Sequence, residues 1–177
     1  MGSIVHSGEL IKKVYVPKYL FPITKVMSSG VNLLASMIAL VIVMVVTRSR
    51  VTPTVMLAVV PLLYVLLFST GVSLFLSAVA VSFRDLMHLY SVITTAWMYL
   101  TPVIYPMSIL EDAPRWVVFI INANPLTAFI KIFRAVVLDG VTPPAILHVQ
   151  SLIWCAIALI VGSLVFKKSQ DSFILKI

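Results

Sequence analysis

Charged side chains are scarce in this sequence: Asp, Glu, Lys and Arg make up 11% of its 177 residues, whereas 61% of the residues are hydrophobic. A soluble globular domain has about 25% charged and about 45–50% apolar residues. The shortage of charge therefore excludes an ordinary soluble domain and indicates an integral membrane protein made of helices.

The sequence also lacks the motifs of several enzyme classes. None of its six glycines precedes a lysine, so it contains no P-loop for ATP. It has no His-Glu-x-x-His and no Gly-x-Ser-x-Gly. Its single cysteine, Cys155, lies in an apolar run and indicates neither a disulfide framework nor a metal site. We therefore expect no catalytic residue, no metal and no cofactor in this chain.

The net charge of +7 does not indicate a nucleic-acid partner, because the basic residues gather at the ends of apolar runs instead of forming one basic face. No Asp, Glu, Lys or Arg lies in the middle of the first, second or fourth apolar run. Carriers coupled to protons or sodium usually need such groups within the membrane. Any transport must therefore be energised by another protein.

A membrane-spanning helix needs about 20 mostly apolar residues, and four apolar runs are long enough. The expected spans cover about residues 26–47, 54–82, 86–105 and 145–166. Four crossings place both termini on one side, where the segments 1–25 and 167–177 and Arg84 together hold eight of the 13 basic residues. Because Lys and Arg concentrate in cytoplasmic segments, both termini are predicted to be cytoplasmic.

The third run is interrupted in its far half by Thr101-Pro102 and Tyr105-Pro106. A proline inside a helix removes a backbone donor and clashes with the preceding turn. In lipid, broken backbone persists only against protein or a wet cavity. We expect the regular helix to break around Thr101, Pro102 and Pro106. Such breaks are typical of transporters, although a simple kink in an ordinary span is the alternative.

The segment 106–144 is expected to be external, and it is too apolar for a free loop. Asn124 as N-cap and Pro125 at the first helical position predict the start of a helix, and Gly140 can end it. The 14 residues from position 125 to 138 would be about 21 Å long, which is too short to span. A re-entrant helix pair is therefore expected, over 107–121 and 125–138.

The second span carries small residues at helical spacing: Ser69, Ser73 and Ser77, with Gly71 and Ala80 nearby. Serines four residues apart lie on one ridge, and small residues let another helix approach closely. We interpret this ridge as an internal packing face. The alternative is a set of serines scattered on a lipid-facing helix.

Three aromatic residues near the predicted outer mouth, Tyr99, Tyr105 and Trp116, have two possible roles. Aromatic faces suit sugar rings, and the polar tips of Tyr and Trp can form hydrogen bonds. Aromatic residues also gather at bilayer interfaces as anchors. Both interpretations remain open from the sequence.

The segment 1–25 is predicted to be cytoplasmic and contains a short amphipathic helix over 7–16. Ser7 can cap this helix, and Glu9 is favourable near its N-terminus. An apolar stripe faces one way, with Lys12 and Lys13 on the other side. Such a helix can rest on anionic lipid or dock on a partner protein, and the sequence leaves both open.

Four stretches in this order resemble one family: LIKKVYVPK at 10–18, FRD at 83–85, LTPVIYP at 100–106, and NPL at 124–126 followed by FR at 133–134. Together they resemble the permease subunit of type-2 ABC exporters of polysaccharides such as O-antigen, teichoic acid and capsular glycans. Members of that family usually begin with a cytoplasmic amphipathic helix and two further spans. The resemblance covers roughly the last two-thirds of such a protein, and we expect the family's N-terminal part to be lacking.

The resemblance implies a permease chain that forms a homodimer and binds two ABC ATP-binding subunits, which would hold ATP and Mg. The chain itself would then be no enzyme. The segment 106–138 would match the family's re-entrant external helices. The residues that would match its ATPase-coupling helix are Glu9, Leu10, Ile11, Lys12, Lys13 and Tyr15.

The expected function is export of a lipid-linked polysaccharide or teichoic acid across a bacterial cell membrane by a single transmembrane domain. One alternative is an exporter of a small molecule or drug. Another is a membrane-embedded enzyme acting on lipid-linked substrates, which would need a cluster of His, Asp or Glu near the membrane surface, where Asp85 and His88 are the only such pair. We interpret Arg84 and Asp85 as a structural ion pair instead.

Overall fold

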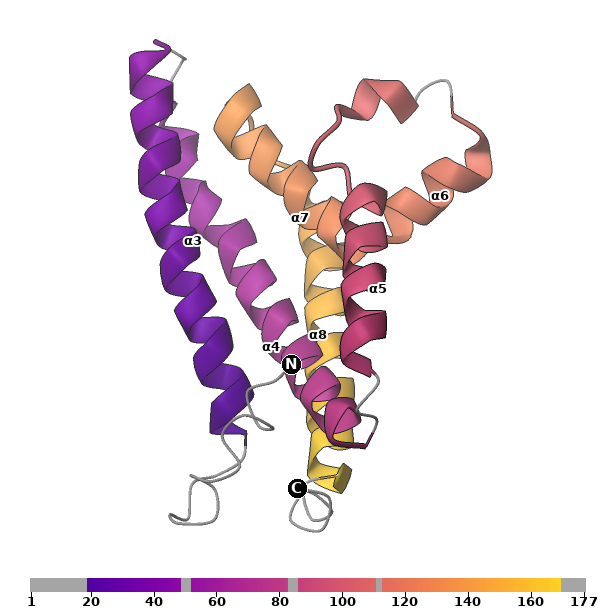
Figure 1. The fold of residues 1–177 in the computed structure, drawn as a ribbon. Helices are drawn as coiled ribbons and strands as arrows, with labels where there is room; N and C mark the ends of the chain where they lie inside the picture. Colours follow the sequence, from indigo (N-terminus) through magenta and orange to yellow (C-terminus); the bar gives the residue numbers. More distant parts are fainter. Residues whose placement is uncertain (1–18, 49–51, 83–85, 111–112, 170–177) are drawn as a thin grey trace. The chain divides into compact units, whose positions relative to one another are not determined.

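The structure is a computed structural model of the chain, and it describes residues 19–48, 52–82, 86–110 and 113–169. In chain order its helices are α3 (Leu20–Val46), η1 (Pro53–Ala58), α4 (Val59–Ser82), α5 (Leu86–Leu100), η2 (Met107–Leu110), α6 (Arg115–Ala123), α7 (Pro125–Arg134), η3 (Ala135–Asp139) and α8 (Ala145–Ser169) (Figure 1). The described ranges contain no strand, and the all-α fold class is confirmed. The amphipathic helix expected over 7–16 lies outside the described residues.

Three helices are long and apolar enough to cross a membrane: α3, α8 and the stretch Pro53–Ala80, which joins η1 to α4. The shortest of them, α8, has 25 residues. At 1.5 Å per residue it is about 37 Å long, more than the roughly 30 Å of the hydrocarbon core. Helix α3 begins at Leu20, earlier than residue 26, because Pro22 lies in its first turn, where no backbone donor is needed.

The third expected span, over 86–105, forms only the 15-residue helix α5. This helix is about 22 Å long and shorter than the hydrocarbon core. It ends at Leu100, directly before Thr101 and Pro102. The residue before a proline is driven away from helical backbone angles, which accounts for the early end.

The segment 106–144 contains a sharply bent helix pair. Helix α6 and the stretch from α7 to η3 (Pro125–Asp139) meet at an angle of 84°. Together they are long and apolar enough for a span, but the bend makes them either a broken span or a re-entrant loop. The described part of the chain therefore holds three spanning helices, or four if this pair crosses.

The chain divides into two compact units, to both of which α4 and α8 contribute. The first unit contains α3, α4 from Leu66 onward and α8 from Cys155 onward. Leu74, Ala78 and Phe166 form its core. Helices α4 and α8 approach closely at Gly71, where an added Cβ would overlap the backbone of Ala158.

The serine ridge of α4 lies against the neighbouring helices of this unit. Ser77 is buried, and the Ser73 hydroxyl donates a hydrogen bond to the carbonyl of Pro22 on α3 (3.4 Å). Gly71 and Ala80 on the same helix are also buried. The interpretation of this ridge as an internal packing face is confirmed.

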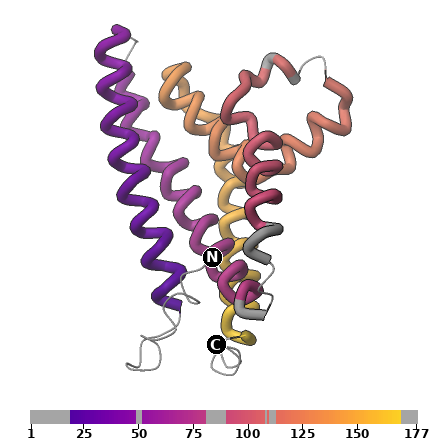
Figure 2. The backbone as a smooth tube through the Cα atoms, viewed as in Figure 1, coloured from indigo at the N-terminus to yellow at the C-terminus, as the bar shows by residue number. Residues whose placement is uncertain are grey.

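The second unit contains η1, the first part of α4, α5 from Leu89 onward, α6, α7, η3 and α8 up to Trp154. Figure 2 traces its backbone from α5 through an irregular turn into α6 and α7. The buried face of α7 and η3 forms its core, with Phe129, Ile132 and Val136 almost fully enclosed. Gly140 ends the π-helical turn η3 with a positive φ of 66°, which confirms its predicted role.

Candidate functional site

The break after α5 begins at buried residues of the second unit and continues into the exposed residues Val103 and Ile104. Thr101 and Pro102, the first residues beyond the helix, are both almost completely enclosed. The segment from Thr101 to Tyr105 is a turn, and the next α-helix starts at Arg115. Backbone groups in such a turn have no helical partners, so other parts of the protein must provide their hydrogen bonds.

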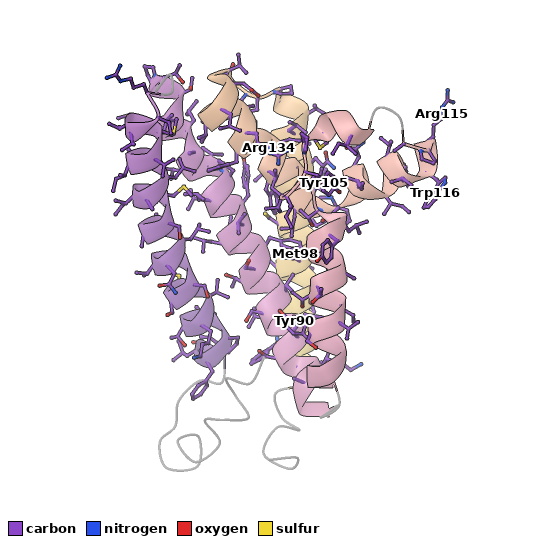
Figure 3. All side chains as sticks on the ribbon, turned by 45° about the horizontal axis from the view of Figure 1, so that its top comes forward. Tyr90, Met98, Tyr105, Arg115, Trp116 and Arg134 are labelled. Atoms are coloured by element: carbon purple, nitrogen blue, oxygen red, sulfur yellow. The ribbon has the colours of Figure 1, made fainter. Side chains whose placement is uncertain are left out.

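Arg134 on α7 supplies two of these bonds. Its Nη2 donates to the carbonyl oxygens of Val103 (3.2 Å) and Tyr105 (3.3 Å). Figure 3 shows Arg134 and Tyr105 next to one another. The guanidinium thus satisfies carbonyls on both sides of Ile104 and fixes the turn to α7.

Asn124, the N-cap of α7 at the bend between α6 and α7, joins that bend to α5. Its Oδ1 accepts from the backbone N–H of Leu126 (3.1 Å) and from Nε1 of Trp97 (3.2 Å). Its Nδ2 donates to the Thr101 hydroxyl (2.9 Å), which in turn donates to the Trp97 carbonyl (2.8 Å). Asn124 is only 6% exposed. Its predicted role as N-cap of α7, with Pro125 in the first turn, is confirmed.

Asn122, two residues earlier, ties the end of α6 to α7 and α8. Its Oδ1 accepts from Nζ of Lys131 on α7 (2.6 Å). Its backbone carbonyl, which is free of a helical partner at the end of α6, accepts from Nε2 of Gln150 on α8 (3.0 Å). The side chains of Lys131 and Gln150 therefore hold Asn122 at the end of α6.

A third set of contacts joins α4, α7 and α8 near the same bend. The Tyr64 hydroxyl is hydrogen-bonded to Nδ1 of His148 at 3.1 Å. The Tyr64 ring also packs against Phe129, with 6.1 Å between the ring centroids. Tyr64 thus joins α4 to both α7 and α8 within the second unit.

Residues 7–138 match the family model described as "ABC-2 type transporter". The chain belongs to this family. The matched range includes all four stretches that carried the resemblance, which is confirmed. Together with the apolar helices, it identifies the chain as a multi-pass membrane protein of the ABC-2 transporter family.

The ABC-2 chain is also similar to curated permeases over nearly its whole length. It is 26% identical over 172 residues to the O-antigen export system permease protein RfbA of Myxococcus xanthus, covering 97% of this chain and 66% of that protein. Two proteins of the same name from Klebsiella pneumoniae are 26% and 27% identical, with 97% of this chain and 65% of each relative covered. The chain thus spans slightly less than two thirds of the length of these relatives.

The three aromatic residues that the sequence suggested for glycan contact lie in different surroundings in this ABC-2 chain. Tyr99 on α5 is 64% exposed and Trp116 on α6 is 67% exposed, whereas Tyr105 is half-buried beside Arg134. Figure 3 shows Trp116 with Arg115 at the far end of α6, away from Tyr105. The structure therefore places Tyr99 directly before the break and Tyr105 within it, whereas Trp116 lies apart (Figure 3).

Two other sets of suggested residues lie outside the described residues: the ATPase-coupling residues Glu9–Tyr15 and the pair Arg84–Asp85. Within the ranges that the structure describes, no group of three or more His, Cys, Asp or Glu side chains could hold a metal ion.

Sequence reasoning named Thr101 and Asn124 but missed the hydrogen bonds that connect them across the break. Trp97 and Thr101 are four residues apart and therefore share one helix face, a signal visible in the sequence. Their partner Asn124 was recognised only as a cap. Nothing in the sequence identified Arg134 as the donor to the turn, because its acceptors lie about 30 residues earlier.

Proposed function

We propose that the chain is the membrane-spanning permease subunit of an ATP-driven ABC exporter that moves a lipid-linked polysaccharide or teichoic acid across the bacterial cell membrane. The observation that carries this proposal is the similarity, over 97% of the chain, to permeases named for O-antigen export. Membership in the ABC-2 transporter family is consistent with it.

The geometry of the second unit supports a role in transport. A long polymer needs a path whose polar lining is provided by protein and not by lipid. The break after α5 and the bend between α6 and α7 place irregular backbone, Asn122, Asn124 and Arg134 together in a membrane protein. Irregular backbone of this kind is found in transporters where it is packed against protein or lines a cavity.

The proposal includes two protein partners. A separate ABC ATP-binding subunit would bind ATP and Mg, hydrolyse the ATP and dock on the segment Glu9–Tyr15. A second copy of the permease would complete the conduit. The permease itself would catalyse no covalent step, and both of its termini would face the cytoplasm.

Co-expression with an ABC ATP-binding subunit of the same organism tests this proposal. We expect the two proteins to co-purify and the glycan to reach the cell surface only when the ATPase is active. A Glu9→Arg, Lys12→Glu, Lys13→Glu variant should lose the ATPase while the permease still inserts. Unchanged co-purification of that variant would show that the segment merely rests on lipid.

The same co-expression experiment tests the two alternative functions. Surface delivery of a small molecule without glycan export would favour a drug exporter. Covalent change of a lipid-linked substrate by the purified chain would favour a membrane-embedded enzyme.

A further inference from the structure

The bent helix pair α6–α7, called the hairpin from here on, is hydrogen-bonded to residues on both sides of the break after α5. Before the break, Asn124 binds Trp97 and Thr101 in the last turn of α5 and just beyond it. After the break, Arg134 binds the carbonyls of Val103 and Tyr105. The two residues of the hairpin are ten positions apart, so α7 connects both sides.

The turn has few hydrogen bonds of its own. Thr101 N–H still reaches the Trp97 carbonyl (3.0 Å), and Val103 N–H bonds to the Thr101 carbonyl (2.7 Å). Pro102 and Pro106 have no N–H to offer. The side chains of the hairpin therefore contribute bonds that the broken helix cannot form within itself.

We propose that Asn124 is a positioning residue that couples α5 to the α6–α7 hairpin, so that the two move as one body. The proposal rests on the proposed function only where it concerns transport, because the coupling itself is a property of the fold. Asn124 uses both functional groups of its amide for this purpose: the oxygen accepts from α5 and α7, and the nitrogen donates to Thr101.

The environment makes this coupling strong. Asn124 and Thr101 are both buried, and a buried polar group without its partner is costly. Hydrogen bonds are stronger in such surroundings than in water, and connected bonds support one another. Separating α5 from the hairpin would leave Nδ2 of Asn124 without its acceptor and Nε1 of Trp97 without its acceptor at the same time.

Asn124 also caps α7, and a serine variant separates the two roles. Serine caps helix N-termini about as well as asparagine. Its side chain is one heavy-atom bond shorter and carries no amide, so it cannot bridge to both Trp97 and Thr101. Asn124→Ser should therefore keep the cap and lose the coupling, whereas Asn124→Ala should lose both.

Hydrogen exchange of the full chain in lipid nanodiscs tests the coupling without reference to transport. In Asn124→Ser we expect exchange in the last turn of α5 to rise about tenfold, while the first turn of α7 stays within about twofold. In Asn124→Ala both should rise. If Asn124→Ser leaves the exchange of α5 unchanged, the coupling does not exist.

Variants on the α5 side provide the reciprocal test. Thr101→Val removes the hydroxyl that accepts from Asn124, and Thr101→Ser retains it. Thr101→Val should raise exchange in the bend around residues 122–126, and Thr101→Ser should restore protection. Equal exchange in the two variants would contradict a role for this hydrogen bond.

A glycan-export measurement with the same variants decides whether the coupling serves transport. Asn124→Ser should slow export while ATPase binding is retained. If Asn124→Ser raises hydrogen exchange in α5 but exports glycan as fast as the wild type, the transport part of the proposal is overturned and the proposed function stays intact. If the wild-type protein exports no glycan, the proposed function is overturned. The coupling is then judged by the hydrogen-exchange measurements alone.

Discussion

Gly162 on α8 lies directly against the carbonyl group of Gly71 on α4, so that a Cβ at either position would overlap the backbone of the other helix. Small residues at such a crossing allow two apolar helices to approach closely and to gain dispersion contacts. The contact joins two of the helices that are long enough to cross a membrane.

We expect Gly162→Ala to destabilise the first unit by about 1–3 kcal/mol, because the backbones must separate to admit the methyl group. The midpoint of thermal unfolding in detergent or lipid measures the effect. Gly30→Ala is the matched control, since its Cβ would meet only the flexible end of Leu66 at 3.0 Å. Alanine also has the higher helix propensity, so this control should be neutral or slightly stabilising. An equal drop in the unfolding midpoint of both variants would contradict a specific contact between α4 and α8.

Two buried threonines of the second unit form a second matched pair. Thr101 and Thr127 are each 1% exposed, but the Thr101 hydroxyl has two hydrogen bonds, whereas that of Thr127 has none within the described residues. Thr101→Val should cost about 1–3 kcal/mol, because it leaves the Asn124 amide unpaired. Thr127→Val should be neutral or stabilising, since valine removes a buried hydroxyl without a partner. A destabilised Thr127→Val protein would instead indicate a bound water at that hydroxyl.

Arg134 provides a third test. Arg134→Met should release the turn over residues 101–106, because the carbonyls of Val103 and Tyr105 lose their donor. Limited proteolysis and thiol labelling of a cysteine at Ile104, in a Cys155→Ala background, should both become several-fold faster. The control is Arg115→Met, which replaces an exposed arginine on α6 that has no hydrogen bond to the described residues. If the two variants label at the same rate, Arg134 does not hold the turn.

Variants of the aromatic residues near the break can distinguish sugar contact from lipid contact. If Tyr99 or Tyr105 binds the glycan, replacing it by leucine should slow export of a long polymer while insertion and ATPase binding stay intact. Cysteines placed at these two positions should then react with water-soluble reagents. Labelling only by lipid-phase reagents would assign them to the interfacial belt instead. Trp116→Leu serves as the comparison, because Trp116 lies apart from the break (Figure 3).

The sequence predicted those parts of the fold that depend on local chemistry. Long apolar runs predicted α3, α4 and α8, and Asn124-Pro125 predicted the start of α7. Thr101 before Pro102 accounts for the end of α5. Gly71 was recognised as a place of close approach, but its partner Gly162 was not, because nothing in the sequence pairs two glycines on distant helices.

The candidate site was less predictable, because it is built from long-range contacts. The hydrogen bonds of Asn124 to Trp97 and Thr101 join residues 27 and 23 positions apart. At the 84° bend, the backbone carbonyl of Asn122 accepts from Gln150, which lies 28 positions later in the sequence. Composition and periodicity describe single helices, and they do not determine which side chains meet.

Whether helix α5 and the bent pair α6–α7 cross the membrane decides whether the number of crossings is odd or even. Three other helices are long enough to cross. If one of these two elements also crosses, the chain makes four crossings and its termini share a side, whichever of the two it is. If both or neither cross, the termini lie on opposite sides. Reporters fused to both termini therefore show whether the number of crossings is odd or even, and not where the crossings occur. A probe in the turn between α5 and α6 reports which element supplies the fourth crossing.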